Sequence, residues 1–100
     1  MIPTADIKNR FVFVIPAYNH GATVVQVIKR ALATGFPVFL VDDGSTDDTA
    51  QLISGIPNLQ VIRHKNNLGK GAALASGFTA AAVNSDWAIT IDADGQHYPE

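Results

Sequence analysis

Two aspartates one residue apart, Asp92 and Asp94, follow the apolar residues 88–91 near the end of the sequence. Residues i and i+2 of an extended segment point to the same side, so these carboxylates can converge on one point, and Gln96 adds an oxygen at the same period. Two close carboxylates repel each other unless a cation lies between them. The pattern therefore predicts a site for Mg²⁺ or Mn²⁺, which prefer oxygen ligands. The alternative is a solvated turn in which the aspartates bond nearby backbone groups.

A second acidic pair, Asp42 and Asp43, follows the apolar residues 38–41 and precedes Gly44. An acidic side chain after such a strand can accept hydrogen bonds from the ribose or the base of a nucleotide. The alternative is turn and helix-cap chemistry for residues 42–47, and both hold if one aspartate is structural and the other binds. Because adjacent strand residues point to opposite sides, we favour Asp43 as the binding residue.

A glycine-rich loop at residues 67–71 precedes a predicted helix and carries Lys70. Exposed amide groups, the positive end of the helix dipole and one lysine suit a phosphate or an electronegative base edge. The loop is not a Walker A motif, because the four-residue gap and the following Ser or Thr are absent. We predict that Lys70 lies beside a ligand and that Arg63 and Lys65 are solvated.

Aromatic and imidazole side chains near these stretches give weaker indications. Tyr18 can stack on a base or pack at the edge of a sheet. His97 could bind a metal or a phosphate, although a lone histidine in a loop usually does neither. No role is predicted for His20 or His64.

Strand-like and helix-like segments alternate along the chain. Strands are expected at residues 11–15, 38–41, 59–62 and 87–91, and helices at residues 22–33, 47–53 and 72–83. The alternation predicts right-handed βαβ units and an α/β fold, in which a Rossmann-like parallel sheet of about four strands lies between helices in three layers. Because the carboxyl ends of parallel strands meet at one edge, the polar stretches should gather into one crevice.

Two local features refine these elements. Pro16 is expected to end the first strand. Ser45 or Thr46 is expected to cap the helix at residues 47–53, whose acidic first turn complements the helix dipole.

The composition indicates one small globular domain. The chain has 100 residues, of which 47% are hydrophobic, and a net charge of −2 with a pI near 5.8. A net negative charge of this size gives no indication of the basic surface that binds nucleic acid. The absence of cysteine excludes disulfides and thiolate metal ligands. No apolar run reaches the roughly 18 residues of a spanning helix, and residues 1–10, which lack a signal-peptide pattern, are expected to be a leader without fixed structure.

Four stretches together resemble the amino-terminal half of a family 2 glycosyltransferase of the GT-A fold. They are residues 14–19 (VIPAYN), 41–47 (VDDGSTD), 67–71 (NLGKG) and 92–94 (DAD). Residues 94–100 (DGQHYPE) are most similar to the dolichyl-phosphate-mannose-synthase-like branch. Each motif is modest alone, but four of them in order at the family's spacing are specific.

The resemblance implies a role for each matching position. Pro16 and Tyr18 would line a nucleoside pocket, Asp43 would contact the base or ribose, and Lys70 would lie beside the donor. The metal ligands would be Asp92, Asp94 and Gln96. The full set of expected substrate-binding residues is Pro16, Ala17, Tyr18, Asp42, Asp43, Gly44, Lys70, Asp92, Ala93 and Asp94. Many members of the lipid-linked branch have Glu after Tyr-Asn, where this sequence has His20.

The reaction implied by the resemblance is a metal-dependent sugar transfer with inversion. The donor would be a nucleoside-diphosphate sugar, and the acceptor a polyprenyl phosphate, another lipid or a saccharide. The acceptor site and the catalytic base are expected after Glu100, so we expect residues 1–100 to be a truncated donor-binding domain, inactive alone and prone to self-association. The full-length protein would act in the cytoplasm, at the inner face of the membrane, in cell-envelope synthesis.

Two other functions are compatible with the residues. Residues 89–95 also resemble the strand-D-x-D-G start of haloacid-dehalogenase-type phosphatases, with Asp92 as nucleophile, although Gln96 replaces the usual Thr or Val. The chain could instead be a nucleotide- and metal-binding fragment without activity.

Overall fold

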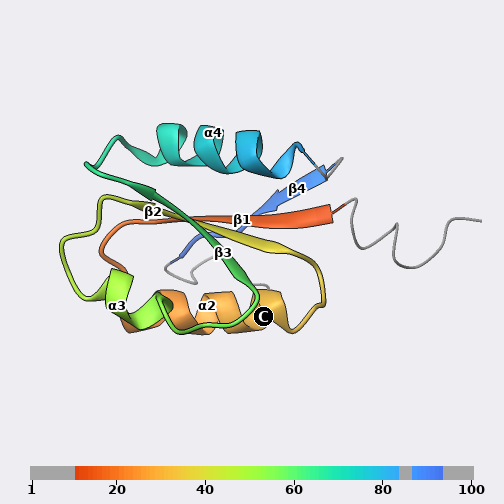
Figure 1. Ribbon diagram of the computed structural model, residues 1–100, viewed down its shortest axis with the longest axis horizontal. Helices are drawn as coiled ribbons and strands as arrows, with labels where there is room; N and C mark the ends of the chain where they lie inside the picture. The colour runs from red at the N-terminus through yellow and green to blue at the C-terminus, as the bar shows by residue number, and fades with distance from the viewer. Residues whose placement is uncertain (1–10, 84–86, 94–100) are drawn as a thin grey trace, which may run out of the picture.

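The computed structural model describes residues 11–83 and 87–93. Within these residues, four parallel strands form one sheet in the order β3-β2-β1-β4. The strands are β1 (Phe11–Ala17), β2 (Val38–Asp43), β3 (Leu59–His64) and β4 (Trp87–Thr90), and the helices are α2 (Ala22–Leu32), α3 (Thr49–Ile53) and α4 (Lys70–Ala81). Helix α4 covers one face of the sheet, and α2 and α3 lie against the other (Figure 1). The predicted three-layer α/β fold is confirmed.

Strand β1 is apolar on both sides, as a strand covered by helices on both faces must be. Val12 and Val14 pack with Ala81 of α4 on one face. Ile15 packs with Ile28 of α2 on the other. None of these side chains is more than 3% exposed, and full burial of a residue as large as isoleucine stabilises a fold by about 1.5–3 kcal/mol.

Helix α4 lies very close to the sheet because its buried face is made of small residues. Ala73, Gly77 and Ala81 recur every four residues and are all buried. A Cβ added to Gly77 would lie 2.4 Å from Cγ1 of Val14. This close packing fixes the position of the amino-terminal end of α4 relative to the end of β1.

Pro16 does not end the first strand as predicted, because β1 continues to Ala17. The carbonyl of Val14 accepts a hydrogen bond from the amide of Ile91 (3.3 Å), so residue 14 directs its polar groups toward the β4 side. Pro16, two residues later, faces the same side, beyond the last pairing of β1 with β4 at Thr90. Proline is tolerated there because the ladder requires no donor at that position.

The other predicted boundaries agree with the structure to within two residues. Strand β2 includes both Asp42 and Asp43, and α4 begins at Lys70 rather than at residue 72. The predicted cap of α3 is wrong: its N-cap is Asp48, which makes no side-chain cap hydrogen bond, and its first turn holds no acidic residue. Within residues 11–83 and 87–93, no helix has the length and apolar character needed to cross a bilayer.

Candidate functional site

A cavity of about 350 Å³ lies at the carboxyl ends of the central strands. The predicted site residues that line it are Pro16, Ala17, Tyr18, Asp43, Lys70, Asp92 and Ala93. His20, Asn67, Gly69 and Ala73 line it as well. Segments from the ends of β1 and β2, the start of α4 and the residues after β4 therefore meet at one edge of the sheet, as parallel strands predict.

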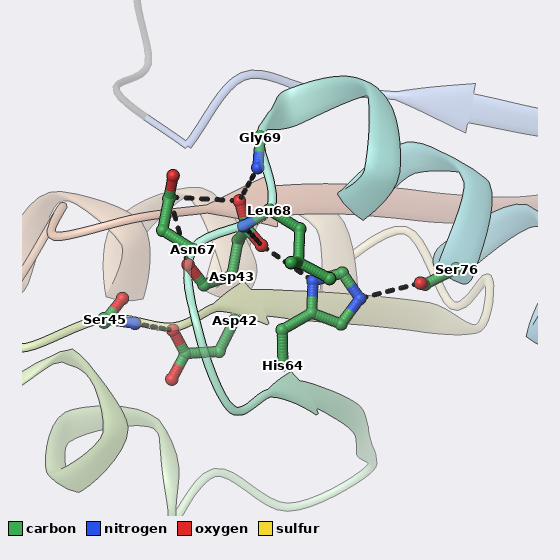
Figure 2. A network of polar contacts seen from close by, with 8 residues as sticks. All are labelled: Asp42, Asp43, Ser45, His64, Asn67, Leu68, Gly69 and Ser76. Carbon is green, nitrogen blue, oxygen red and sulfur yellow. Dashed lines mark hydrogen bonds and ion pairs between the residues drawn. The ribbon is translucent and has the colours of Figure 1, made fainter.

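Asp43 is the most extensively hydrogen-bonded residue of this cavity. Its Oδ1 accepts hydrogen bonds from Nδ1 of His64 (2.7 Å) and from the amide of Leu68 (2.9 Å). Its Oδ2 accepts from Nδ2 of Asn67 (3.1 Å) and from the amide of Gly69 (2.8 Å). Figure 2 shows these donors converging on the carboxylate, which is 3% exposed. Asp43 therefore ties the glycine-rich loop to the end of β2.

The same contacts determine the ionisation of Asp43. Burial alone would raise the pKa of its carboxyl group, but the hydrogen bonds from His64, Leu68 and Gly69 outweigh burial and hold the pKa below its ordinary value. Asp43 is therefore a carboxylate at neutral pH, with acceptor atoms only.

His64 and Ser76 were not predicted to belong to the site. Nε2 of His64 lies 2.7 Å from Oγ of Ser76 in α4, while its Nδ1 holds Asp43. His64 and Asp43 are partners in the register of β3 with β2, which places their side chains on the same face. Their positions at the ends of paired strands were the one signal in the sequence that could have linked them.

Asp42 points to the opposite side of β2 from Asp43 (Figure 2) and does not line the cavity. Its Oδ1 accepts a hydrogen bond from the amide of Ser45 (3.0 Å), and its Oδ2 lies 3.5 Å from Nε of Arg63. The side chain is 1% exposed, and its Oδ2 makes no hydrogen bond. In this structure Asp42 holds the turn after β2, and Arg63 is its ionic partner, with a side chain that is 54% exposed and so remains solvated as predicted.

Gly44 also lies outside the cavity lining, but its position admits only glycine. Its φ of 76° is in the left-handed region. An added Cβ would lie 2.4 Å from the backbone carbon of Asn66 and from the amide nitrogen of Asn67. The missing side chain thus allows the turn after β2 to pass directly against the glycine-rich loop.

Asn19 joins the loop after β1 to the loop after β2. Its backbone amide donates to Oγ of Ser45 (3.0 Å), and its side-chain Oδ1 accepts from the backbone amides of Thr46 (2.8 Å) and Asp47 (3.2 Å). These contacts explain why Ser45 and Thr46 do not cap α3. They also fix the segment that carries Tyr18, whose side chain is 42% exposed at the cavity.

Lys70 and Asp92 meet at the rim of the cavity. Nζ of Lys70 lies 2.8 Å from Oδ1 of Asp92, and the two side chains are 63% and 24% exposed. The pair joins the first residue of α4 to the segment that follows β4. A positive and a negative group, both accessible to a ligand, thus lie beside each other in the cavity.

The predicted metal site is only partly within the described residues. Asp92 lies in the cavity, whereas Asp94, Gln96 and His97 lie outside residues 11–83 and 87–93. Among those residues, no three His, Cys, Asp or Glu side chains are grouped so that they could hold a metal ion. An accessible carboxylate at this edge fits one ligand of a magnesium or manganese ion.

The chain is similar in sequence to a family of known proteins and to several individual members. Residues 12–100 match the family model described as Glycosyl transferase family 2. The chain is 36% identical over 95 residues to an uncharacterized protein of Methanocaldococcus jannaschii (93% of this chain, 39% of that protein). It is 32% identical over 103 residues to the undecaprenyl-phosphate 4-deoxy-4-formamido-L-arabinose transferase of Proteus mirabilis (92% and 31%). To the transferase of the same name from Pseudomonas paraeruginosa it is 36% identical over 99 residues (87% and 28%). The chain spans about a third of the length of these relatives.

Proposed function

Because this chain belongs to glycosyl transferase family 2, we propose that its cavity binds the nucleoside-diphosphate sugar from which the whole protein transfers a sugar. The observation that best supports this proposal is that Lys70 and Asp92 share one cavity with Tyr18 and Asp43. A lysine suits the diphosphate, an exposed aromatic ring suits the base, and a buried carboxylate suits a donor group of the nucleoside.

The nucleoside is proposed to bind at the end of β1. Pro16 and Ala17 give this part of the cavity an apolar wall, and Tyr18 offers a ring on which a base can stack. Asp43 accepts hydrogen bonds at the same place. His20, whose Nδ1 accepts a hydrogen bond from the amide of Tyr18 (3.1 Å), supports the backbone there.

The diphosphate is proposed to bind beside Lys70 and Asp92, which form an ion pair at the rim of the cavity. The proposed ligands of a divalent cation are Asp92, Asp94 and Gln96, and Mg²⁺ or Mn²⁺ suits their oxygen atoms. When bound, such an ion supplies Lewis-acid neutralisation of the charge that develops on the departing nucleoside diphosphate. Lys70 adds a second positive group on the α4 side of the cavity.

The proposed reaction is a transfer with inversion. An acceptor oxygen attacks the anomeric carbon, as an anion in the case of a phosphate or with transfer of its proton to a base in the case of a hydroxyl. The bond from that carbon to the diphosphate oxygen breaks, and its electron pair leaves with the nucleoside diphosphate. Relatives from Proteus mirabilis and Pseudomonas paraeruginosa are named as undecaprenyl-phosphate transferases, which favours a polyprenyl phosphate as acceptor. The acceptor site and the base are proposed to lie after Glu100.

Donor binding can be tested by calorimetric titration of the protein with UDP and with GDP, each with and without Mn²⁺. We expect one of the two to bind, more tightly with Mn²⁺. Lys70→Met should weaken that binding, and the full-length enzyme should transfer sugar to a polyprenyl phosphate. If neither nucleotide binds under any condition, the proposed donor site is wrong. If binding occurs but the full-length protein transfers no sugar, the alternative of a nucleotide-binding protein without activity is correct.

A further inference from the structure

A line of three side chains connects the cavity to helix α4. Asp43 of β2, His64 of β3 and Ser76 of α4 are joined by two contacts of 2.7 Å each (Figure 2). The side chain of His64 is 11% exposed and lies between its two partners. A histidine that is hydrogen-bonded at both ring nitrogens has a fixed orientation, and it can therefore hold the carboxylate that it contacts in one position.

The acceptors of Asp43 are fully used by protein donors. A carboxylate offers about four lone-pair positions, and four donors occupy them: His64, Asn67 and the amides of Leu68 and Gly69. Because the carboxylate can only accept, Nδ1 of His64 must carry the hydrogen. In a neutral ring, Nε2 is then the acceptor, and the hydroxyl of Ser76 donates to it.

The order of these groups is that of a nucleophile, a base and an acid, but the surroundings of Ser76 do not suit hydrolysis. Ser76 lies in the interior of α4, where the helix uses the neighbouring amide groups for its own hydrogen bonds. Stabilising an oxyanion requires amide or side-chain donors aimed at the reacting carbonyl. The three residues are therefore better suited to holding a structure in place.

We propose that His64, oriented by Ser76, is the positioning residue of the nucleotide site. By holding Oδ1 of Asp43, it keeps the carboxylate aimed at the amides of Leu68 and Gly69. Those amides begin the segment that enters α4 and places Lys70 at the cavity. The position of the lysine thus depends on a histidine that does not line the cavity.

His64 also explains how Asp43 can accept a hydrogen bond from a ligand. Of the four donors, Asn67 provides the one side chain that lines the cavity, and its contact with the carboxylate is the longest, at 3.1 Å. A donor group of the nucleoside can take the place of the Asn67 amide while His64, Leu68 and Gly69 keep the carboxylate in position. This step rests on the proposed function, whereas the role of His64 in fixing the loop does not.

Amide hydrogen exchange and ¹⁵N NMR of the protein test the loop directly. In the wild type, the His64 ring should show a hydrogen on Nδ1. In His64→Leu, exchange of the Leu68 and Gly69 amides should become about tenfold faster than in the wild type, because a hydrogen bond to a charged group is lost. The exchange rates of the β1 amides serve as the internal reference. His64→Asn, which keeps a donor near the Nδ1 position, should restore most of the protection.

Two variants of α4 provide the matched comparison. Ser76→Ala should alter the signals of the His64 ring and speed exchange at Leu68 and Gly69 several-fold. Thr79→Ala removes a hydroxyl that donates to the carbonyl of Ala75 on the same helix (2.8 Å) and takes no part in the contacts of His64, so it should change neither. Unchanged exchange at Leu68 and Gly69 in His64→Leu would overturn the proposal, as would equal effects of the two α4 variants.

A titration with UDP and with GDP separates this proposal from the proposed function. If the wild type binds one of them, His64→Leu should weaken that binding about tenfold and His64→Asn by much less. If the wild type binds neither but the exchange results hold, the proposed function fails and the role of His64 stands.

Discussion

Lys70 and Asp92 form an ion pair that joins the start of α4 to the segment after β4, with Nζ 2.8 Å from Oδ1. The lysine side chain is 63% exposed and the aspartate side chain 24%. Exposed pairs of this kind contribute only about 0–1 kcal/mol to stability. The pair therefore adds little to folding, which is compatible with the ligand-binding role proposed for it.

Lys70→Met should weaken the binding of a nucleoside diphosphate about tenfold, because a charge-assisted contact with the phosphates is lost. The melting temperature should change little. Lys29→Met, at an exposed position of α2, should change neither quantity. Calorimetric titration and thermal unfolding measure both. A drop in melting temperature with unchanged affinity would assign Lys70 a structural role instead.

Asp92→Asn and Asp94→Ala should each weaken the Mn²⁺-dependent part of nucleotide binding roughly tenfold or more, since each removes a charged ligand. Asp47→Ala should not, because Asp47 bonds the amide of Thr49 at the start of α3 instead (2.9 Å). Titrations with Mn²⁺ and after its removal by EDTA give the comparison. Equal losses in all three variants would contradict the metal assignment.

The two aspartates of β2 should respond differently to substitution. Asp43→Asn should weaken nucleotide binding and loosen the loop that holds Lys70. Asp42→Asn should lower the free energy of unfolding with little effect on binding, because that side chain is buried on the other side of β2 against Ser45 and Arg63. Urea unfolding and calorimetry distinguish the two. Loss of binding in Asp42→Asn alone would reverse the assignment.

The stability contributed by Asp43 should depend on pH. Its folded-state pKa is lowered, so its contribution is complete above the unfolded pKa of about 3.9 and is lost as the pH falls through the folded value. The difference in free energy of unfolding between wild type and Asp43→Asn should therefore shrink between neutral pH and about pH 3. Urea unfolding at both pH values tests this. A difference that is constant with pH would contradict the lowered pKa.

Two glycines of α4 should respond oppositely to alanine. Gly77→Ala should destabilise the fold by about 1–3 kcal/mol, because its Cβ would lie 2.4 Å from Val14 in a packed core. Gly71→Ala, whose Cβ meets nothing within 4 Å, should be neutral or stabilise the helix by about 0.5–1 kcal/mol. Thermal unfolding of both variants provides the measurement. A neutral Gly77→Ala would show that α4 does not lie as close to β1 as described.

The sequence alone determined the fold and the place of the cavity. Apolar runs that alternate with amphipathic segments leave a parallel sheet as the simple arrangement, and the carboxyl ends of parallel strands must share an edge. The sequence therefore predicts that four side chains lie together, namely those of Tyr18, Asp43, Lys70 and Asp92. Periodicity reports which side of an element a residue faces, and that was enough for this purpose.

Which atoms meet depends on how segments far apart in the sequence pack together. His64 lies 21 residues from Asp43 and 12 from Ser76, and nothing local in the sequence distinguishes it from a solvated histidine. Its role follows from the register of β3 with β2 and from the close approach of α4, which only a helix with Gly77 facing the sheet permits.

The roles of Ser45 and Thr46 also depend on a distant residue. By local pattern they are candidate helix caps, but in the structure they bond Asn19, which is more than 25 residues away in the sequence. Hydrogen bonds require atoms to lie within about 3 Å, and packing between distant segments, rather than local pattern, sets such distances.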